Sequence, residues 1–495
     1  MDRIRKLFHT FSKTEVRYLK IQLGAFHNRG SNKALELIEH LERHPEIGNH
    51  EMAELLYGEP GSKAFIMLKS RLFERMTETL SLSINFQNNP EIKEDPAAYA
   101  SISLHKDLIY AMLLLRRGLE DMARELLTDC VDRATAYDLP EFRLQALLFL
   151  QGLSQSRDEV TFKYRAEIDQ TQAQYQTDIQ GLGIWNEFRI MQSHKTSGDD
   201  QREVFIREKM TLLEQRLAAH YSPRTHYYYL YIRVNYHALR SEWEAGREAL
   251  REMIELLKTR KGLAQRNRLG LPWCQLAELE LRTCRFRDAI HAADQALSIL
   301  PRRRNYYNTS IYKTFAAIYS GDLDLARGII QGLHWFTSQK EHARDASLTA
   351  YLDACICYLR EDYRTAWNTL EGAQGLLDDK EGWNAGIRIF EMIILFDLGQ
   401  YDLIITRIES MRKHLSRYKA NLRTELILRF WHLLERQAFD LGRLPEEVNT
   451  LLQRLAAEDP WVPLGHEVVR FEAWLEARRT RQPLYPLLQR QAGQS

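Results

Sequence analysis

WCQLAELELRTCRFRDAIHAADQALSILP, residues 273–301, has the pattern of two short helices joined by a tight turn. Trp273 and Ala277 lie one helical turn apart on a first predicted helix, and Ala289 and Ala296 recur seven residues apart on a second. Small residues let two helices approach closely, larger apolar residues fill the space between them, and a proline ends the second helix. This segment therefore predicts a helical hairpin.

The hairpin resembles a tetratricopeptide (TPR) repeat. It has the Trp-x-x-Leu opening at Trp273 and Leu276, the alanines of the second helix and the closing proline, Pro301. It departs from the motif at Ala277, Glu280 and Ala293, where the family has Gly, Tyr and Phe. The resemblance implies a right-handed α-solenoid whose first helices line a concave groove, and a function in binding other proteins.

Weaker copies of this pattern recur along most of the chain, with predicted turns about every 40 residues. Glycine (24) and proline (13) are both scarce, which favours helices over turn-rich β-structure. Two of the hairpins are expected over residues 141–178 and 181–220. We therefore predict an all-α chain in which about eight hairpins form a solenoid over residues 98–479, followed by a C-terminal tail over residues 480–495.

The first 86 residues do not keep this spacing. They predict a separate N-terminal helical domain, followed by a polar linker over residues 87–97. Ser12 and Glu15 have the spacing of a capping box, in which each residue satisfies a backbone donor of the other at the start of a helix. A helix is therefore expected to begin at Ser12.

Residues 49–84 read as a short helix, a tight turn and a longer helix, an order that also resembles a helix-turn-helix segment. In that interpretation Lys63, Lys69 and Arg71 lie on the second helix and contact nucleic acid. The other interpretation is a helical bundle that seals the end of the solenoid. Glu74 on the same helix favours the bundle, because it opposes the basic residues.

Tyrosines gather on two of the predicted first helices. Tyr228, Tyr231 and Asn235 are three to four residues apart, so they share one helical face. Tyr351 and Tyr358 have a similar arrangement two to three hairpins later. The resemblance implies that this face lines the groove, where tyrosines anchor a protein or peptide partner through apolar area and a polar tip. Core packing between hairpins is the other interpretation, and both stay open.

The chain has 68 Lys and Arg against 67 Asp and Glu, so its net charge gives no overall reason to expect a nucleic-acid or membrane partner. Residues 256–317, however, hold twelve basic residues and four acidic ones. Arg302, Arg303 and Arg304 lie in a predicted loop beside tyrosines, which suits an acidic peptide, a phosphorylated partner or single-stranded nucleic acid. The alternative is a solvated loop cluster balanced by acidic neighbours.

Signatures of catalysis and cofactor binding are incomplete. The chain has no Gly-x-Ser-x-Gly elbow and no full dinucleotide fingerprint. His40 and His44 have the spacing of a metal pair, but they stand at a predicted helix end, where histidine is favourable, so no metal is expected. The five cysteines are scattered and form no Cys-x-x-Cys pair, and no apolar run approaches the roughly 20 residues of a spanning helix. These features predict a cytoplasmic protein without a transmembrane segment.

We therefore expect a scaffold or adaptor without enzyme activity or cofactor, which binds a protein or peptide in the groove of a helical-repeat solenoid. One alternative is a transcriptional or signalling regulator with a DNA-contacting N-terminal segment and a TPR-like sensor. A second alternative is RNA binding through the basic residues of 256–317. No feature of the sequence predicts the oligomeric state.

Overall fold

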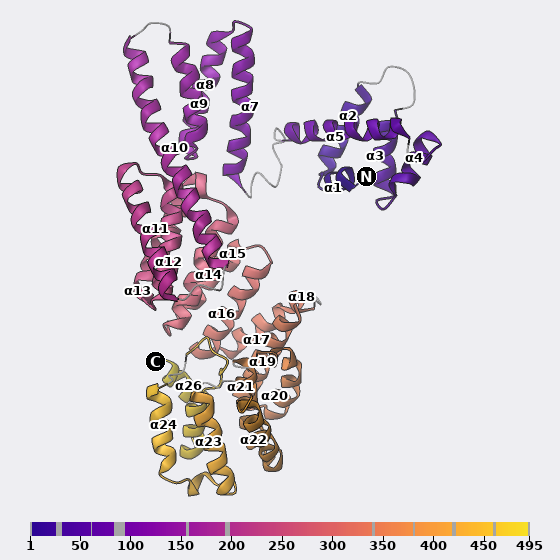
Figure 1. The fold of residues 1–495 in the computed structure, drawn as a ribbon. Coiled ribbons are helices and arrows are strands. Elements are labelled where there is room, and N and C mark those ends of the chain that lie inside the picture. The colour runs from indigo at the N-terminus through magenta and orange to yellow at the C-terminus, as the bar shows by residue number, and fades with distance from the viewer. Residues whose placement is uncertain are drawn as a thin grey trace. The chain divides into compact units, whose positions relative to one another are not determined.

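Every regular element of the protein is a helix in the ranges that the computed structural model describes, and no β-strand occurs in them. These ranges are residues 2–25, 32–60, 62–83, 95–154, 158–193, 199–338, 342–379, 382–417, 422–458 and 462–493. The predicted all-α class is confirmed. Most helices pack against the helix that follows them in the chain (Figure 1). The chain divides into two compact units, Met1–Asp169 and Gln170–Ser495.

The first five helices share a core of their own, in which Leu19, Leu37 and Met76 are fully buried. The capping box is confirmed: the Ser12 N–H donates to Glu15 Oε2 (2.6 Å) and the Glu15 N–H donates to Ser12 Oγ (3.3 Å). The five helices are α1 (Asp2–Phe8), α2 (Lys13–Ala25), α3 (Lys33–Arg43), α4 (Asn49–Tyr57) and α5 (Lys63–Ser83).

Three further helices in the first unit, α7 (Pro96–Arg116), α8 (Glu120–Ala136) and α9 (Pro140–Gly152), form a second core. Asp95 caps α7, because its side chain accepts from the Ala98 N–H (3.0 Å). Of the predicted linker, residues 87–94 lie outside the described residues, and residues 95–97 belong to the start of α7 and its cap.

α10 (Asp158–Ser193) is a single helix of 36 residues where the sequence predicts parts of two hairpins, 141–178 and 181–220. The expected break near Gly181 is wrong. Gly181 serves a close approach instead of a turn, because a methyl group there would lie 2.6 Å from Thr225 Oγ1. α11 (Asp199–Ala219) follows it.

The rest of the second unit is a series of helix pairs, and we call the members of each pair its first helix and its second helix. The predicted hairpin of residues 273–301 is confirmed as one of them, α14 with α15. The pairs are α12 (Pro223–Leu239) with α13 (Trp243–Thr259), α14 (Arg266–Arg282) with α15 (Phe286–Ile299), α16 (Arg304–Ser320) with α17 (Leu323–Gly332), α19 (Ala343–Leu359) with α20 (Tyr363–Leu370), α21 (Trp383–Asp397) with α22 (Tyr401–Leu415), α23 (Leu422–Arg436) with α24 (Glu447–Glu458), and α25 (Phe471–Thr480) with α26 (Leu484–Ala492). Shorter helices are α18 (His334–Thr337), η1 (Lys261–Leu263), η3 (Glu371–Leu376) and η4 (Leu441–Arg443).

One turn geometry joins the two helices of successive pairs. The turn residue has a left-handed backbone, and the next N–H donates to a carbonyl five residues earlier, as Asp322 does to Ala317 (2.9 Å). This is the bonding pattern of a Schellman cap, which satisfies the last carbonyls of the first helix. The turn residues are Ser241, Cys284, Gly321, Glu361 and Gly399.

The C-terminal pairs share the largest core of the protein, which extends from α14 to α26. In this core the rings of Trp431 and Trp474 lie 5.3 Å apart, and both side chains are fully buried. Residues 480–495 are predicted as a C-terminal tail, but Leu487 and Leu488 of α26 pack into this core. Burial of these leucines explains why the chain continues as a helix here.

Candidate functional site

An irregular segment between α24 and α25, residues 462–470, lies against four successive first helices, and we call it the C-terminal strap. The Tyr319 hydroxyl of α16 donates to the Val468 carbonyl (3.3 Å), and the Tyr351 hydroxyl of α19 donates to the His466 carbonyl (2.8 Å). On α21, Gly386 has no side chain, and a methyl group there would overlap the His466 carbonyl oxygen. The first helices therefore hold the strap through its backbone, which is how a protein binds an extended peptide.

Arg423 of α23 completes this contact through a buried ion network. Its Nε and Nη2 donate to the two carboxylate oxygens of Glu467 in the strap (2.7 and 2.8 Å). Its Nη1 and Nη2 also donate to Glu472 at the start of α25 (2.8 and 2.5 Å). Burial disfavours the charge on Arg423, but the two carboxylates outweigh it and raise the pKa of the guanidinium. The network fastens the strap to α23.

Tyr351 and Tyr358 lie on α19, on the side of the first helices that the strap and α25 cover, which we call the covered face. Both are buried, with 1% of each residue exposed. Tyr358 donates to the carboxylate of Asp397, which also accepts from Arg478 Nη2 of α25 (2.7 Å). Burial raises the pKa of both phenols well above its ordinary value. These two tyrosines therefore pack in the core, and their hydrogen-bond partners are residues of the chain itself.

Tyr228, Tyr231 and Asn235 lie on α12, where they contact α10. The ring of Trp185 stacks on Tyr228 (5.3 Å between centroids) and meets the edge of Tyr231 (4.9 Å). Gln192 Nε2 donates to Asn235 Oδ1 (2.9 Å). Tyr228 is buried, whereas Tyr231 and Asn235 are half-buried. These predicted residues are together, and two of them retain an accessible part.

The three arginines of the 302–304 loop differ in their surroundings. Arg302 and Arg303 are exposed. Arg304 forms an ion pair with Asp345, and its guanidinium lies 5.6 Å from the centre of the Tyr307 ring. The loop is 47 or more residues from Tyr351 and Tyr358 in sequence, and no hydrogen bond or ion pair joins these tyrosines to Arg302 or Arg303 within the described ranges.

Three further cations of residues 256–317 lie over aromatic rings, a placement that the sequence did not predict. Lys258 Nζ is 5.4 Å from the centre of the Trp273 ring. The guanidinium carbons of Arg260 and Arg268 are 5.9 and 5.7 Å from the ring centres of Tyr221 and Tyr227. All three cations were part of the charge count, but only the fold shows which ring each one faces.

In the N-terminal domain, Lys63 and Arg71 are exposed on α5, whereas Lys69 is half-buried. Lys69 Nζ donates to Asn49 Oδ1 of α4 (3.1 Å) and lies 4.9 Å from the centre of the Phe65 ring. Two of the three predicted nucleic-acid contacts are therefore accessible, and the third is engaged within the domain.

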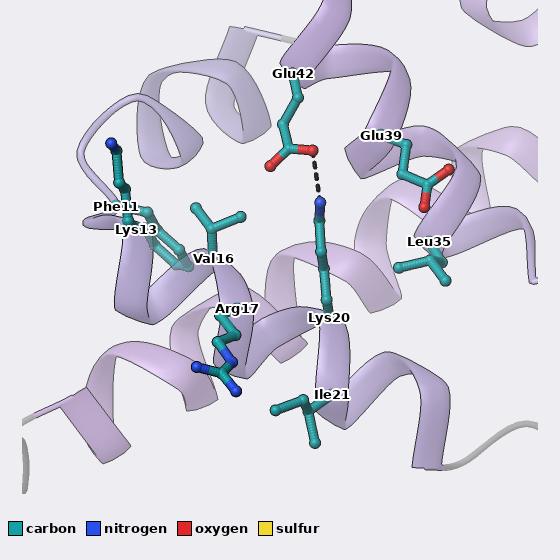
Figure 2. A pocket seen from close by; sticks show the side chains of 9 residues that line it. All are labelled: Phe11, Lys13, Val16, Arg17, Lys20, Ile21, Leu35, Glu39 and Glu42. Carbon is teal, nitrogen blue, oxygen red and sulfur yellow. Dashed lines mark hydrogen bonds and ion pairs between the residues drawn. The ribbon is translucent and has the colours of Figure 1, made fainter.

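A pocket of about 600 Å³ between α2 and α3 was not predicted (Figure 2). Lys20 Nζ and Glu42 Oε2 form an ion pair across it, 2.6 Å apart. Its lining combines apolar, basic and acidic side chains from the two helices and from Phe11, which precedes α2. The lining residues are Phe11, Lys13, Val16, Arg17, Lys20, Ile21, Leu35, Glu39 and Glu42.

The described residues contain no group of three His, Cys, Asp or Glu side chains placed to hold a metal ion. None of the described helices is long and apolar enough to cross a membrane. In comparisons with known proteins, no family model matches the chain, and no curated protein matches its sequence.

Proposed function

We propose that this protein is a non-catalytic scaffold or adaptor that binds a segment of another protein, and that its helix pairs form a TPR-like right-handed solenoid. One observation carries the proposal: four successive first helices contact the irregular C-terminal strap. Three of them bond its backbone or its Glu467 carboxylate through side chains, and the fourth lies against it at Gly386. Contacts of this kind suit an extended peptide, because backbone bonds give affinity and pockets for side chains give selectivity.

The partner would bind the first helices that the strap does not contact, α12 and α14. Tyr231 and Asn235 of α12 are half-buried, and so is Gln275 of α14. Tyrosine and amide side chains provide apolar area and hydrogen bonds at partly desolvated positions, which is typical of interface anchors. The C-terminal first helices would serve the fold itself, because their tyrosines are already bonded.

Site-specific photo-crosslinking tests this proposal. A photoreactive amino acid replaces Tyr231 or Asn235 on the first helix α12 and, as a control, Glu248, which is exposed on the second helix α13. We expect a protein crosslink from the α12 positions and none from Glu248. Crosslinks from Glu248 alone would contradict binding to the first helices. An absence of crosslinked protein at all three positions would contradict the scaffold function.

A further inference from the structure

The excess positive charge of residues 256–317 gathers at two loops that lie side by side. One joins α13 to α14 and the other joins α15 to α16. Gly270 in the first turns of α14 packs against Leu300 of the second loop, since a methyl group at 270 would lie 2.6 Å from Leu300 Cδ2. We call the cations in and beside the two loops that have no carboxylate partner among the described residues the basic edge. They are Lys258, Lys261, Arg268, Arg302 and Arg303.

The basic edge differs from the other cations of the same segment in its lack of carboxylate partners. Arg282 pairs with Glu278 (2.8 Å), and Lys313 pairs with Asp294 (2.6 Å). Arg285 and Arg304 also have acidic partners, Glu244 and Asp345. Within the part of the chain that the structure describes, no ion pair forms at Lys258, Lys261, Arg268, Arg302 or Arg303. The loops therefore carry charge that the fold does not neutralise.

Aromatic rings lie against two cations of the basic edge and against the neighbouring Arg260. Lys258, Arg260 and Arg268 lie within 6 Å of the ring centres of Trp273, Tyr221 and Tyr227. From its place over the ring, the Arg268 guanidinium can donate through its N–H groups, in a fork that matches a carboxylate. Burial raises the pKa of Tyr227 to about 12, so this phenol stays neutral and supplies no negative charge to Arg268. The site is preorganised for an anion from outside the chain.

We propose that the basic edge binds a carboxylate-rich segment of a partner protein, with its acidic side chains spanning the two loops. This inference rests on the proposed scaffold function and names the chemistry of the partner. A protein segment fits better than single-stranded nucleic acid, because bases need free aromatic faces to stack on. Tyr227 is buried, and each of the three rings already has a cation near its centre.

Fluorescence anisotropy of the full chain with a labelled glutamate-rich peptide tests the assignment. The double substitution Arg302→Glu with Arg303→Glu is expected to weaken binding about tenfold or more, because each lost ion pair is replaced by repulsion. Arg268→Gln is expected to weaken it about threefold. Arg116→Glu with Arg117→Glu is the matched control, since these adjacent arginines are exposed on a different helix and the net charge changes equally.

Three outcomes would overturn the assignment: no binding by the unmodified chain, an equal loss in the control, or tighter binding of a single-stranded RNA that the edge substitutions abolish. The last outcome would assign the basic edge to nucleic acid. Photo-crosslinking from Tyr231 in the unmodified chain separates the two proposals. A crosslink from Tyr231 in a chain that does not bind the glutamate-rich peptide leaves the scaffold function standing and removes the acidic segment.

Discussion

Helices α7–α9 and helices α16–α26 pack by similar pairing but protect their apolar side chains to different degrees. On α7 the side chains of Ile102, Ile109 and Leu113 are each nearly half exposed or more, and they share one helical face. In α16–α26 the first helices are covered on a further side by the C-terminal strap and α25. Among the described residues of that region the exposed large apolar side chains are Tyr401, Leu403, Ile405 and Val462.

The first helices of α16–α26 are covered by residues of the chain itself. The hydroxyl groups of Tyr319 and Tyr351 donate to carbonyls of the strap, and Arg423 forms ion pairs with two carboxylates, one from the strap and one from α25. These groups act as structural anchors. The cations of Arg302 and Arg303 and the apolar face of α7 have no such cover in the described residues.

The largest expected effect is at Arg423. Arg423→Ala leaves Glu467 and Glu472 buried without their cation, and we expect a loss of about 3–5 kcal/mol in the free energy of unfolding. Arg133→Ala is the comparison on α8, where Arg133 pairs with Asp107 (2.5 Å) at a half-exposed position, and a loss of about 1 kcal/mol is expected. Calorimetric unfolding of both variants measures the difference. Equal losses would show that the strap network is no more buried than a surface pair.

Gly386→Ala and Gly183→Ala should change stability in opposite directions. Alanine is usually better than glycine inside a helix by about 0.5–1 kcal/mol, and Gly183 on α10 has open space around it, so this substitution is expected to stabilise by that amount. At Gly386 the added methyl group meets the His466 carbonyl, and we expect a loss of about 1–3 kcal/mol. Urea unfolding of the two variants measures the sign. Stabilisation by Gly386→Ala would mean that the strap does not lie on α21.

Alkaline pH is expected to lower the free energy of unfolding of the C-terminal helices. Burial raises the pKa of Tyr319, Tyr351 and Tyr358 well above 10, whereas in the unfolded chain each phenol loses its proton near pH 10. The unfolded state therefore binds fewer protons above pH 10, and the free energy of unfolding falls as pH rises, by about 1.4 kcal/mol per pH unit for each tyrosine. Below pH 9 these groups contribute no slope.

Tyr351→Phe isolates one of these contributions. The variant lacks the ionisable group, so the slope of stability against pH between pH 10 and 11 should be shallower by about 1 kcal/mol per unit. It also loses the bond to His466, which is expected to lower stability at pH 7 by about 1 kcal/mol. If the slope of stability against alkaline pH is the same in the variant and the unmodified chain, the Tyr351 hydroxyl is in contact with water and not buried. Denaturant titrations at several pH values provide the measurement.

Structural features that depend on residues close together in the sequence could be predicted. The capping box of Ser12 and Glu15 and the hairpin of residues 273–301 depend on neighbours within a few turns, and both are confirmed. The turns were harder, because Ser241, Cys284 and Glu361 adopt the left-handed backbone without being glycine. Conversely, the break expected between residues 178 and 181 does not occur, and Gly181 lies inside α10.

The covered face could not be predicted, because it depends on residues far apart in the chain. The Tyr351 bond to His466 joins positions separated by 115 residues, and Arg423 reaches Glu467 across 44. The helical spacing of Tyr351 and Tyr358 is the same whether the face meets solvent, a partner or the strap. Only the packing of the strap on α16–α23 distinguishes these cases. The basic edge was predicted in part, because the excess of basic residues in 256–317 can be counted in the sequence. Which of these residues lack a carboxylate partner depends on the fold.

The smallest effect is expected on the exposed face of α7. Ile109 is 51% exposed, so Ile109→Gln removes little buried apolar area, and the free energy of unfolding should change by less than about 0.5 kcal/mol. Its neighbour Leu108 is 4% exposed, and Leu108→Ala should cost about 2–5 kcal/mol through lost burial and a cavity. Thermal unfolding of both variants compares the two faces of one helix. If Ile109→Gln is as damaging as Leu108→Ala, the apolar face of α7 is covered in solution, and the contrast with α16–α26 disappears.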